Sequence, residues 1–219
     1  MSDKYGRSFH LPWSPGGTSD DKRMSSVEGL LGVEIVITEK MDGGNACLTR
    51  ENVWARSHST PAKEYWWSMV KAMHATVSSG IDDGLSIFGE NIWPVHSITY
   101  TEDLPGPFLM FNVREDDTQT WWSWDDVEMA SEALEIPTVP VLFRGVVNSE
   151  DELRDLTTRL ASMPSVYGPD REGLVVRVAR AFTTDEFPRC LGKHVRASHV
   201  QTDDHWTTNV VPQPCFRRA

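Results

Sequence analysis

Short apolar runs alternate along the chain with polar turns that are rich in glycine or proline. Runs of β-branched and aromatic residues predict strands at about 33–38, 45–50, 53–57, 85–90, 108–113, 139–143, 173–178 and 191–196. Three longer stretches predict helices, which begin at Pro61, at Ser123 and at the capping box of Ser149, and end near residues 80, 135 and 161. Strands and helices do not alternate as βαβ units, so the pattern predicts an α+β fold built on antiparallel sheets.

Apolar side chains within these elements predict where the core lies. Four of them recur at helical spacing, which predicts that their face of the first helix is buried: Tyr65, Met69, Met73 and Val77. Five tryptophans could stack on bases, but their positions favour packing in the core or at its rim: Trp66, Trp67, Trp121, Trp122 and Trp124. Near the N-terminus, Phe9, Leu11 and Trp13 are too apolar for a free tail, so an ordered loop is expected there.

Composition narrows the class of protein only slightly. The chain has 219 residues, 39% of them hydrophobic, without internal repeats or a clear linker, so one domain over residues 1–219 is expected. No apolar run approaches the roughly 20 residues of a membrane span, and no signal peptide is evident, so no membrane association is expected. The 3 cysteines are widely scattered, which favours a cytoplasmic location over a disulfide framework or a metal site.

The charge is negative but unevenly spread. A formal net charge of -11 argues against a general nucleic-acid coat protein. From Asp170 to the end, eight Arg and Lys residues oppose six Asp and Glu residues, which leaves +2 there and -13 in the rest of the chain. A polyanion should therefore meet the C-terminal third or a local pocket, unless so small an excess is only a solvated face.

One polar turn carries candidate chemistry. The β-branched run of residues 33–38 leads into EKMDGG (residues 39–44), where Lys40 lies between two acids and ahead of two glycines. A strand end holds a side chain in place, and glycines let a phosphate approach the backbone. Burial or a neighbouring cation can lower a lysine pKa from about 10.4, which frees the amine as a nucleophile. Taken alone, the turn would be interpreted as a solvated lysine in a β-turn.

Five further stretches follow the lysine turn in a definite order. VWARS ends a strand near Arg56, IFGE ends one with Glu90, FLMFN holds Phe111, EGLVVR begins a strand at Glu172, and LGKHVR bears Lys193 and Arg196. Alone, each of these residues would be interpreted as a surface charge, a strand-edge ion pair or ordinary core.

In this order the six stretches resemble the covalent nucleotidyltransferase superfamily of polynucleotide ligases and capping enzymes, and within it the ATP-dependent RNA ligase family. The resemblance runs from EKMDGG to KHVR, and the segments HLPWSPG and RASHVQTDDHW are similar to the small bacterial and phage members. It implies an adenylyltransferase fold of antiparallel sheets flanked by helices, with an ATP cleft between them. Because the chain ends soon after the last stretch, no C-terminal OB-fold is expected.

The resemblance also implies a reaction. Lys40 matches the family's nucleophile, which attacks the α-phosphate of ATP with Mg²⁺ or Mn²⁺ and becomes a lysyl-adenylate. AMP then passes to an RNA 5′-phosphate, and a 3′-hydroxyl displaces AMP to seal the strand. In-line attack at phosphorus depends on positioning and charge neutralisation, which suits the lysines and carboxylates of these stretches.

Four positions match residues that bind the nucleotide in the family. Glu39 would lie by the adenine edge through its backbone, and Arg56 near the ribose and phosphate. Glu90 would accept a hydrogen bond from a ribose hydroxyl, a role that suits a carboxylate. Phe111 would stack on adenine.

Three more positions match groups near the reacting phosphate. Asp42 and Glu172 would hold the metal ion, mainly through water, and the metal would lower the charge cost at the α-phosphate. Lys193 would contact that phosphate, and its field would favour an unprotonated Lys40.

The grip on RNA is less clearly specified. Arg196 is displaced by one residue from the family's K-x-K pattern, which in a strand puts it on the other face. The side chains expected to contact RNA are Arg189, Arg196, Arg217 and Arg218, with a partner protein or the HLPWSPG segment as alternatives. A polar group near the C-terminus is interpreted as an exposed loop rather than a metal site: His199, Asp203, Asp204 and His205.

Two rival functions stay open on sequence alone. Sealing of a DNA nick, or transfer of AMP to another acceptor, shares the same first chemical step. A non-catalytic module that binds a nucleotide or an RNA end could keep the same fold, although such a binder would need no nucleophilic lysine.

Overall fold

The β-branched and aromatic runs pair into two sheets in the computed structural model, which describes residues 4–17, 21–57, 60–197, 207 and 210–214. Sheet A contains, in order, β1 (Phe9–His10), β11 (Leu191–Val195), β9 (Gly173–Val178), β2 (Glu34–Lys40) and β8 (Val141–Val146). Sheet B contains, in order, β10 (Phe182–Thr183), β7 (Thr120–Trp121), β6 (Phe108–Glu115), β5 (Leu85–Asn91), β3 (Gly44–Leu48) and β4 (Val53–Ala55). Neighbouring strands are antiparallel except β1 and β11. The predicted α+β class with antiparallel sheets is confirmed.

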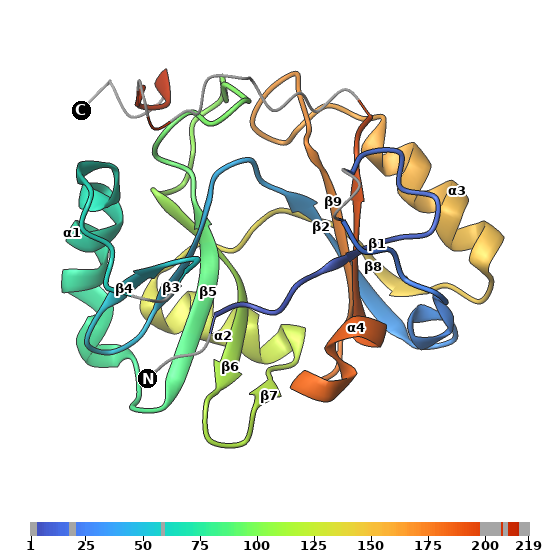
Figure 1. Ribbon diagram of the computed structural model, residues 1–219, viewed down its shortest axis with the longest axis horizontal. Coiled ribbons are helices and arrows are strands. Elements are labelled where there is room, and N and C mark those ends of the chain that lie inside the picture. Colours follow the sequence, from blue (N-terminus) through green and yellow to red (C-terminus); the bar gives the residue numbers. More distant parts are fainter. Residues whose placement is uncertain (1–3, 18–20, 58–59, 198–206, 208–209, 215–219) are drawn as a thin grey trace.

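Helices flank the two sheets (Figure 1): α1 (Ser68–Val77), α2 (Trp124–Leu134), α3 (Glu150–Ala161) and the short α4 (Phe187–Cys190). Ser123 and Ser149 cap α2 and α3 as predicted, because each side-chain oxygen accepts a hydrogen bond of 3.2 Å from the backbone N–H three residues on. None of the helices within the described ranges is long and apolar enough to cross a membrane.

Each sheet buries one face under its helices. Val70 of α1 and Val127 of α2 belong to the same buried cluster as Ile87 of sheet B. On sheet A, Ile37 belongs to a second cluster that includes Leu153 of α3. Burying an apolar side chain of this size is worth about 1.5–3 kcal/mol. The remaining faces of the two sheets turn toward each other.

The first helix differs from its prediction. It begins at Ser68 rather than near Pro61, after a 3-10 turn at Tyr65–Trp67. The predicted buried face is only half right: Met73 and Val77 pack partly buried against the core, whereas Tyr65 is 60% exposed and Met69 is 40% exposed. The helix instead buries Val70 and His74, and His74 can enter the core because its Nε2 is hydrogen-bonded to the Thr49 carbonyl at 2.7 Å.

Other differences lie at strand ends and short pairings. β2 continues through Lys40, and β8 begins and ends later than the predicted 139–143. The sequence pattern missed the two-residue strands β1, β7 and β10, which exist only through partners far along the chain. It also missed α4, which is only 4 residues long. The tryptophans lie in the core or at its rim, as predicted: Trp67, Trp121 and Trp124 are buried, and Trp66 and Trp122 are half-buried.

An N-terminal tyrosine fastens the two sheets together. The Tyr5 ring lies 5.1–5.3 Å, centroid to centroid, from four rings: Phe88, Phe111, Trp121 and Phe187. Its hydroxyl accepts a 2.8 Å hydrogen bond from Asn112 of sheet B, and Asn112 in turn accepts one from Arg177 of sheet A. Burial lowers the pKa of Arg177 to about 10, and its guanidinium also donates to the Trp122 carbonyl at 2.6 Å.

This network predicts a measurable loss when one oxygen is removed. Tyr5→Phe leaves the buried Asn112 amide without its acceptor, which should lower the free energy of unfolding by about 1–3 kcal/mol. Urea denaturation measures the change, and Tyr65→Phe on the exposed surface is the matched control. Equal stabilities for the two variants would contradict the structural role of the Tyr5 hydroxyl.

Candidate active site

Strand pairing brings the predicted nucleophile to the predicted metal-orienting acid. Lys40 is the last residue of β2 and lies opposite Gly173, the first residue of β9. Its Nζ donates a 2.6 Å hydrogen bond to Oε2 of Glu172, the residue just before β9. The Lys40 side chain is 27% exposed and that of Glu172 is 8% exposed. The pair is therefore largely shielded but reachable from solvent.

The pKa of Lys40 is set by the acids around it. Burial alone would lower this pKa, but the negative charges of Glu172, Glu90 and Asp42 outweigh burial and hold the pKa above its ordinary value. The free protein therefore keeps Lys40 as an ammonium ion. The expectation of a lowered pKa in this state is wrong, because carboxylates rather than cations dominate its surroundings.

Glu90 and Arg56 join the same cluster. Glu90 is half-buried near the end of β5, and burial raises its pKa to about 8, with the like charges of Glu172 and Asp42 acting in the same direction. Lys40 and Arg56 act against this rise. Arg56 is exposed directly after β4. The end of sheet B thus supplies one acid and one cation to the cleft beside Lys40.

Asp42 fastens the lysine turn to the loop after β5. Its Oδ2 accepts hydrogen bonds of 2.7 and 3.0 Å from the backbone and side chain of Ser97, and one of 2.6 Å from the Ile98 N–H. Its own N–H donates to the Tyr100 hydroxyl at 2.8 Å. These contacts give Asp42 a structural role. The predicted contact with the water shell of a metal stays a prediction.

Steric crowding explains why the first glycine of the turn, Gly43, cannot be another residue. A Cβ on Gly43 would lie 2.4 Å from the Asn91 carbonyl oxygen, a distance that no side chain tolerates. The turn therefore needs glycine in order to pass β5 closely. Access of a phosphate, which the sequence suggested for this glycine, is not required to explain it.

Glu39 faces away from Lys40, as alternation along β2 requires. Its carboxylate is 1% exposed, accepts a 3.0 Å hydrogen bond from the Val166 N–H and lies 3.3 Å from the Arg171 guanidinium. The side chain thus holds the segment before β9. The predicted contact with adenine runs through the Glu39 backbone, and it stays a prediction.

Phe111 lies at the meeting point of the two sheets. It belongs to β6 and is half-buried, and its ring meets Tyr5 edge-on at 5.1 Å. Glu90 influences the pKa of Tyr5, which burial raises, so the aromatic group lies near the acidic cluster. A ring that is held by Tyr5 and still partly exposed is suited to stacking on a planar base.

Lys193 lies in the middle of β11, opposite Val175 of β9. Burial lowers its pKa, and the nearby Lys40 acts in the same direction. Its Nζ lies 3.4 Å from the Asp21 carboxylate, which sequence reasoning did not single out. Lys193 is therefore close enough to Lys40 for their charges to interact, but it already faces an acid.

The predicted RNA contacts are spread along sheet A. Arg196 follows β11 and lies 3.3 Å from the Asp170 carboxylate. Arg189 is exposed in α4, before β11 begins, and so lies toward the end of sheet A opposite Lys40. The remaining candidates and the polar group near the C-terminus lie outside the described residues: Arg217, Arg218, His199, Asp203, Asp204 and His205.

The donor set fits a nucleotide and a divalent ion. Glu172 already holds a cation, the Lys40 ammonium, at 2.6 Å. Among the described residues, no three His, Cys, Asp or Glu side chains gather as direct metal ligands. A metal ion that binds few protein groups and keeps most of its waters, as Mg²⁺ usually does, suits this arrangement.

Sequence reasoning missed several residues that hold the site: Tyr5, Asp21, Ser97 and Tyr100. Ser97 and Tyr100 contact Asp42 across 55 and 58 positions, and no local pattern marks such pairs. Tyr5 could have been suspected, because it opens the apolar N-terminal segment.

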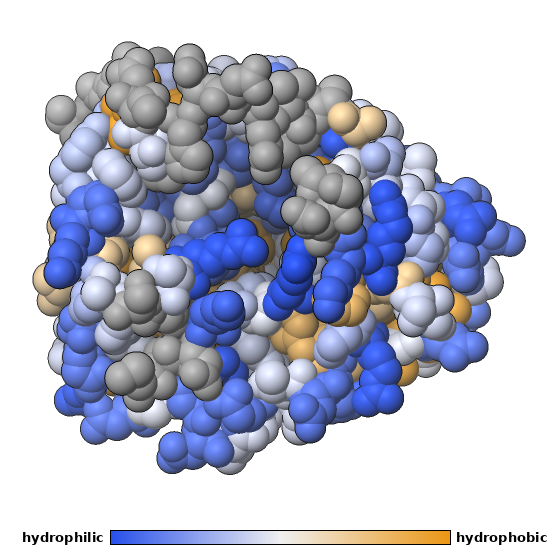
Figure 2. All heavy atoms as spheres, in the orientation of Figure 1, coloured by the Kyte–Doolittle hydropathy of each residue, from blue (hydrophilic) through white to orange (hydrophobic). Residues whose placement is uncertain are grey.

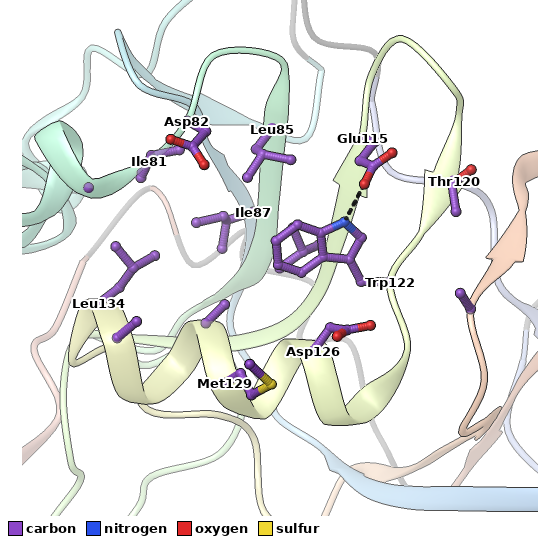
Figure 3. A pocket seen from close by; sticks show the side chains of 15 residues that line it. Ile81, Asp82, Leu85, Ile87, Glu115, Thr120, Trp122, Asp126, Met129 and Leu134 are labelled. Carbon is purple, nitrogen blue, oxygen red and sulfur yellow. Dashed lines mark hydrogen bonds between the residues drawn. The ribbon is translucent and has the colours of Figure 1, made fainter.

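The view in Figure 2 shows that the face between the two sheets is hollowed and edged by strongly hydrophilic side chains. A separate apolar groove of about 540 Å³ lies elsewhere, between β5, β6 and α2, with Ile87, Trp122 and Met129 in its lining (Figure 3). Ile87 and Phe88 point to opposite faces of β5, and only Phe88 meets Tyr5. The groove is therefore not part of the lysine site.

Comparisons with known proteins agree with this geometry. A family model described as RNA ligase matches residues 33–195. No protein among the curated sequences matches the chain. Naegleria gruberi RNA ligase with PPi has a similar structure, with a TM-score of 0.61 and 18% identity over 91% of this chain and 62% of that chain. A mutant of that ligase with ATP and Mn has a TM-score of 0.60 and 14% identity, again over 91% of this chain and 62% of that chain.

A ligand-free mutant of the Naegleria enzyme gives a TM-score of 0.60 and 16% identity, over 80% of this chain and 53% of that chain. At such identities the likeness shows the fold, and the chain spans between 53% and 62% of the length of these structures. The fold is that of a nucleotidyltransferase. By the family match over residues 33–195, the chain belongs to the RNA ligase family.

The raised pKa of Glu90 predicts a pH-dependent stability. The unfolded carboxyl ionises near 4.5, whereas the folded one ionises near 8. Glu90 therefore reduces stability progressively as the pH rises from about 4.5 to 8. Glu90→Gln removes this loss, so its stability relative to the original protein should increase from pH 5 to pH 9 in thermal unfolding.

Glu186 is a control for this prediction, because its pKa is shifted in the opposite direction. The Thr183 N–H and Arg180 hold the pKa of Glu186 below its ordinary value, so Glu186→Gln should not gain stability at high pH. If Glu90→Gln shows no gain between pH 5 and pH 9, Glu90 is ionised in the folded protein at neutral pH.

Proposed function

We propose that this protein is an ATP-dependent RNA ligase. It forms a lysyl-adenylate on Lys40 with release of pyrophosphate, transfers AMP to an RNA 5′-phosphate and seals that end to a 3′-hydroxyl with release of AMP. The observation that carries the proposal is the Lys40–Glu172 contact of 2.6 Å, in a cleft that also holds Lys193. Because both sheets contribute to the cleft, residues 1–219 are proposed to form a single nucleotidyltransferase domain.

The cleft offers a place for each part of the nucleotide. Phe111 stacks on adenine beside the Glu39 backbone, and Glu90 binds a ribose hydroxyl. With a pKa of about 8, Glu90 can also donate a hydrogen bond near neutral pH. Arg56 and Lys193 neutralise the phosphates from the two sides of the cleft.

Lys40 must lose a proton before it can attack the α-phosphate. In the free protein Glu172 stabilises its ammonium form. A divalent ion, when bound with Glu172 and with Asp42 through water, supplies positive charge at the phosphates and at these carboxylates. Glu172 then no longer holds the proton on Lys40, and the burial of Lys40 favours the neutral amine.

The neighbours support this assignment of cofactors. Structures of the Naegleria ligase and its mutants contain ATP with Mn, AMP with Mn, or PPi. Those molecules are a substrate, a part of an intermediate and a product of the reaction proposed here. Mg²⁺ or Mn²⁺ is accordingly the proposed metal of this chain.

The substrate is proposed to be RNA with 5′-phosphate and 3′-hydroxyl ends, held weakly by the isolated chain. A partner protein that supplies the grip remains a second proposal, because the described cations at Arg189 and Arg196 are few and separated. Cys47 and Cys190 are both buried and are not joined in a disulfide, which is compatible with the proposed reducing cytoplasm.

Covalent adenylation of Lys40 is the direct test. With ATP labelled at the α-phosphate and a divalent ion, denatured protein should retain the label, because the AMP is covalently bound. Lys40→Ala should lose it completely, and NAD should not replace ATP. Label that persists in the folded Lys40→Ala variant would refute the assignment of the nucleophile.

Stacking by Phe111 should be measurable as nucleotide affinity. Phe111→Ala should weaken ATP binding by on the order of 1–3 kcal/mol, and Phe111→Leu should be intermediate. Isothermal calorimetry without metal measures binding apart from catalysis. If both variants fold and keep the original affinity, Phe111 serves only as core.

The two reaction steps should differ in their response to salt. Sealing depends on contacts with RNA phosphates, each of which adds roughly 0.9 to the log–log salt slope on a duplex. We expect sealing to fall steeply between low and moderate salt, while self-adenylation changes little. Arg196→Ala should flatten the slope for sealing if it contacts RNA, whereas poor sealing at every salt concentration favours a partner protein.

The same assay separates the rival acceptors. Nicked duplexes with RNA or DNA on the 3′-hydroxyl side are compared after adenylation with ATP. Preferential sealing of DNA would favour the nick-ligase alternative. Failure of the wild-type protein to form the adenylate would favour the non-catalytic module.

A further inference from the structure

The HLPWSPG segment clasps the strand that carries Lys193. His10 of β1 lies opposite Lys193 in a parallel pairing, and the Leu11 N–H donates to the Lys193 carbonyl at 2.7 Å. Further along, the Ser14 hydroxyl accepts a 2.9 Å hydrogen bond from the Val195 N–H. The segment therefore covers the edge of β11, and its backbone and the Ser14 hydroxyl are hydrogen-bonded to that strand.

The chain then returns alongside β1 and delivers an acid to the site. The His10 N–H donates to the Lys22 carbonyl at 2.8 Å, and the Met24 N–H donates to the His10 carbonyl at 2.7 Å. These two bonds fix the backbone directly after Asp21. One oxygen of Asp21 lies 3.4 Å from Lys193 Nζ and 3.6 Å from His10 Nε2.

The charge that faces Asp21 here is that of Lys193. His10 is 2% exposed, and burial lowers its pKa to about 4, so the imidazole is neutral at pH 7. The Lys193 side chain is 18% exposed and that of Asp21 is 27% exposed. A phosphate that approaches Lys193 therefore meets an ammonium that already has an anionic neighbour.

We propose that Asp21 is a residue of the phosphate subsite, which occupies Lys193 in the free protein and competes with an incoming polyphosphate for it. This rests on the proposed function, in which Lys193 binds nucleotide phosphate. A carboxylate and a phosphate oxygen are both anionic acceptors, and like charges close together in a partly buried site repel strongly. The cost is greatest for a bare polyphosphate and smaller when a divalent ion has reduced its charge.

Asp21 thereby acts as a specificity-determining residue. It lowers the affinity for metal-free nucleotide more than the affinity for the metal complex, so the site selects the form of ATP that can react.

Calorimetry with α,β-methylene-ATP tests the proposal, because this analogue cannot transfer AMP from its α-phosphorus with loss of pyrophosphate. Asp21→Asn should tighten its binding about tenfold in EDTA and only about threefold with Mg²⁺, as expected for removal of one nearby like charge. Binding of uncharged adenosine should not change. Asp21→Glu should restore the original affinities, and Asp21→Ser provides the same test if Asp21→Asn does not fold.

Two matched variants isolate the contact. In a Lys193→Met background, Asp21→Asn should bring much less tightening, because no ammonium is then set free. Glu34→Gln removes one charge from an exposed ion pair with Arg144 at the opposite end of sheet A, and it should change nothing.

The possible outcomes separate the two proposals. Unchanged or weaker binding of the analogue by Asp21→Asn overturns the role of Asp21, while binding by the wild-type protein still supports a nucleotide site. Equal tightening for adenosine overturns it as well, since the effect would not act on phosphate. A wild-type protein that binds neither adenosine nor the analogue overturns the proposed function, and this inference with it.

Discussion

The ion pair between Lys40 and Glu172 depends on the register of two antiparallel strands. Lys40 ends β2 opposite the first residue of β9, and Glu172 immediately precedes that residue. A shift of one residue would turn Lys40 toward α3 and separate the charges. Such a shift would remove Ile35 and Ile37 from the buried cluster that includes Leu153 of α3, and it would separate the Glu39 carboxylate from Arg171. Packing on both faces of β2 therefore fixes the position of Lys40 opposite the start of β9.

Charge balance in the cleft explains the state of the free protein. Three carboxylates influence Lys40, and Asp21 faces Lys193, so each lysine has an internal anion in the absence of phosphate. Such pairing limits the cost of holding ammonium groups in a partly buried site. In the proposed reaction, a nucleotide with its metal would replace part of this internal pairing, and its binding would in this way alter the protonation of Lys40.

The aromatic contacts of Tyr5 link the cleft to the stability of the whole molecule. Tyr5 touches Phe111 directly and joins the two sheets through Asn112 and Arg177. The predicted adenine platform is thus supported by the same network that holds the sheets together. The N-terminal residues contribute to the site twice, through Tyr5 at the sheet junction and through Asp21 at Lys193.

The sequence by itself determined the α+β class, most strand positions and the residue types of the site, because alternation and turn chemistry are local. Only the tertiary structure decided that Asp42 fastens the Ser97 loop, that Asp21 faces Lys193 and that the first helix buries Val70 rather than Met69. It also reversed the expected direction of the Lys40 pKa. Such features depend on distances between residues far apart in the chain, and electrostatic energies follow those distances rather than the order of residues.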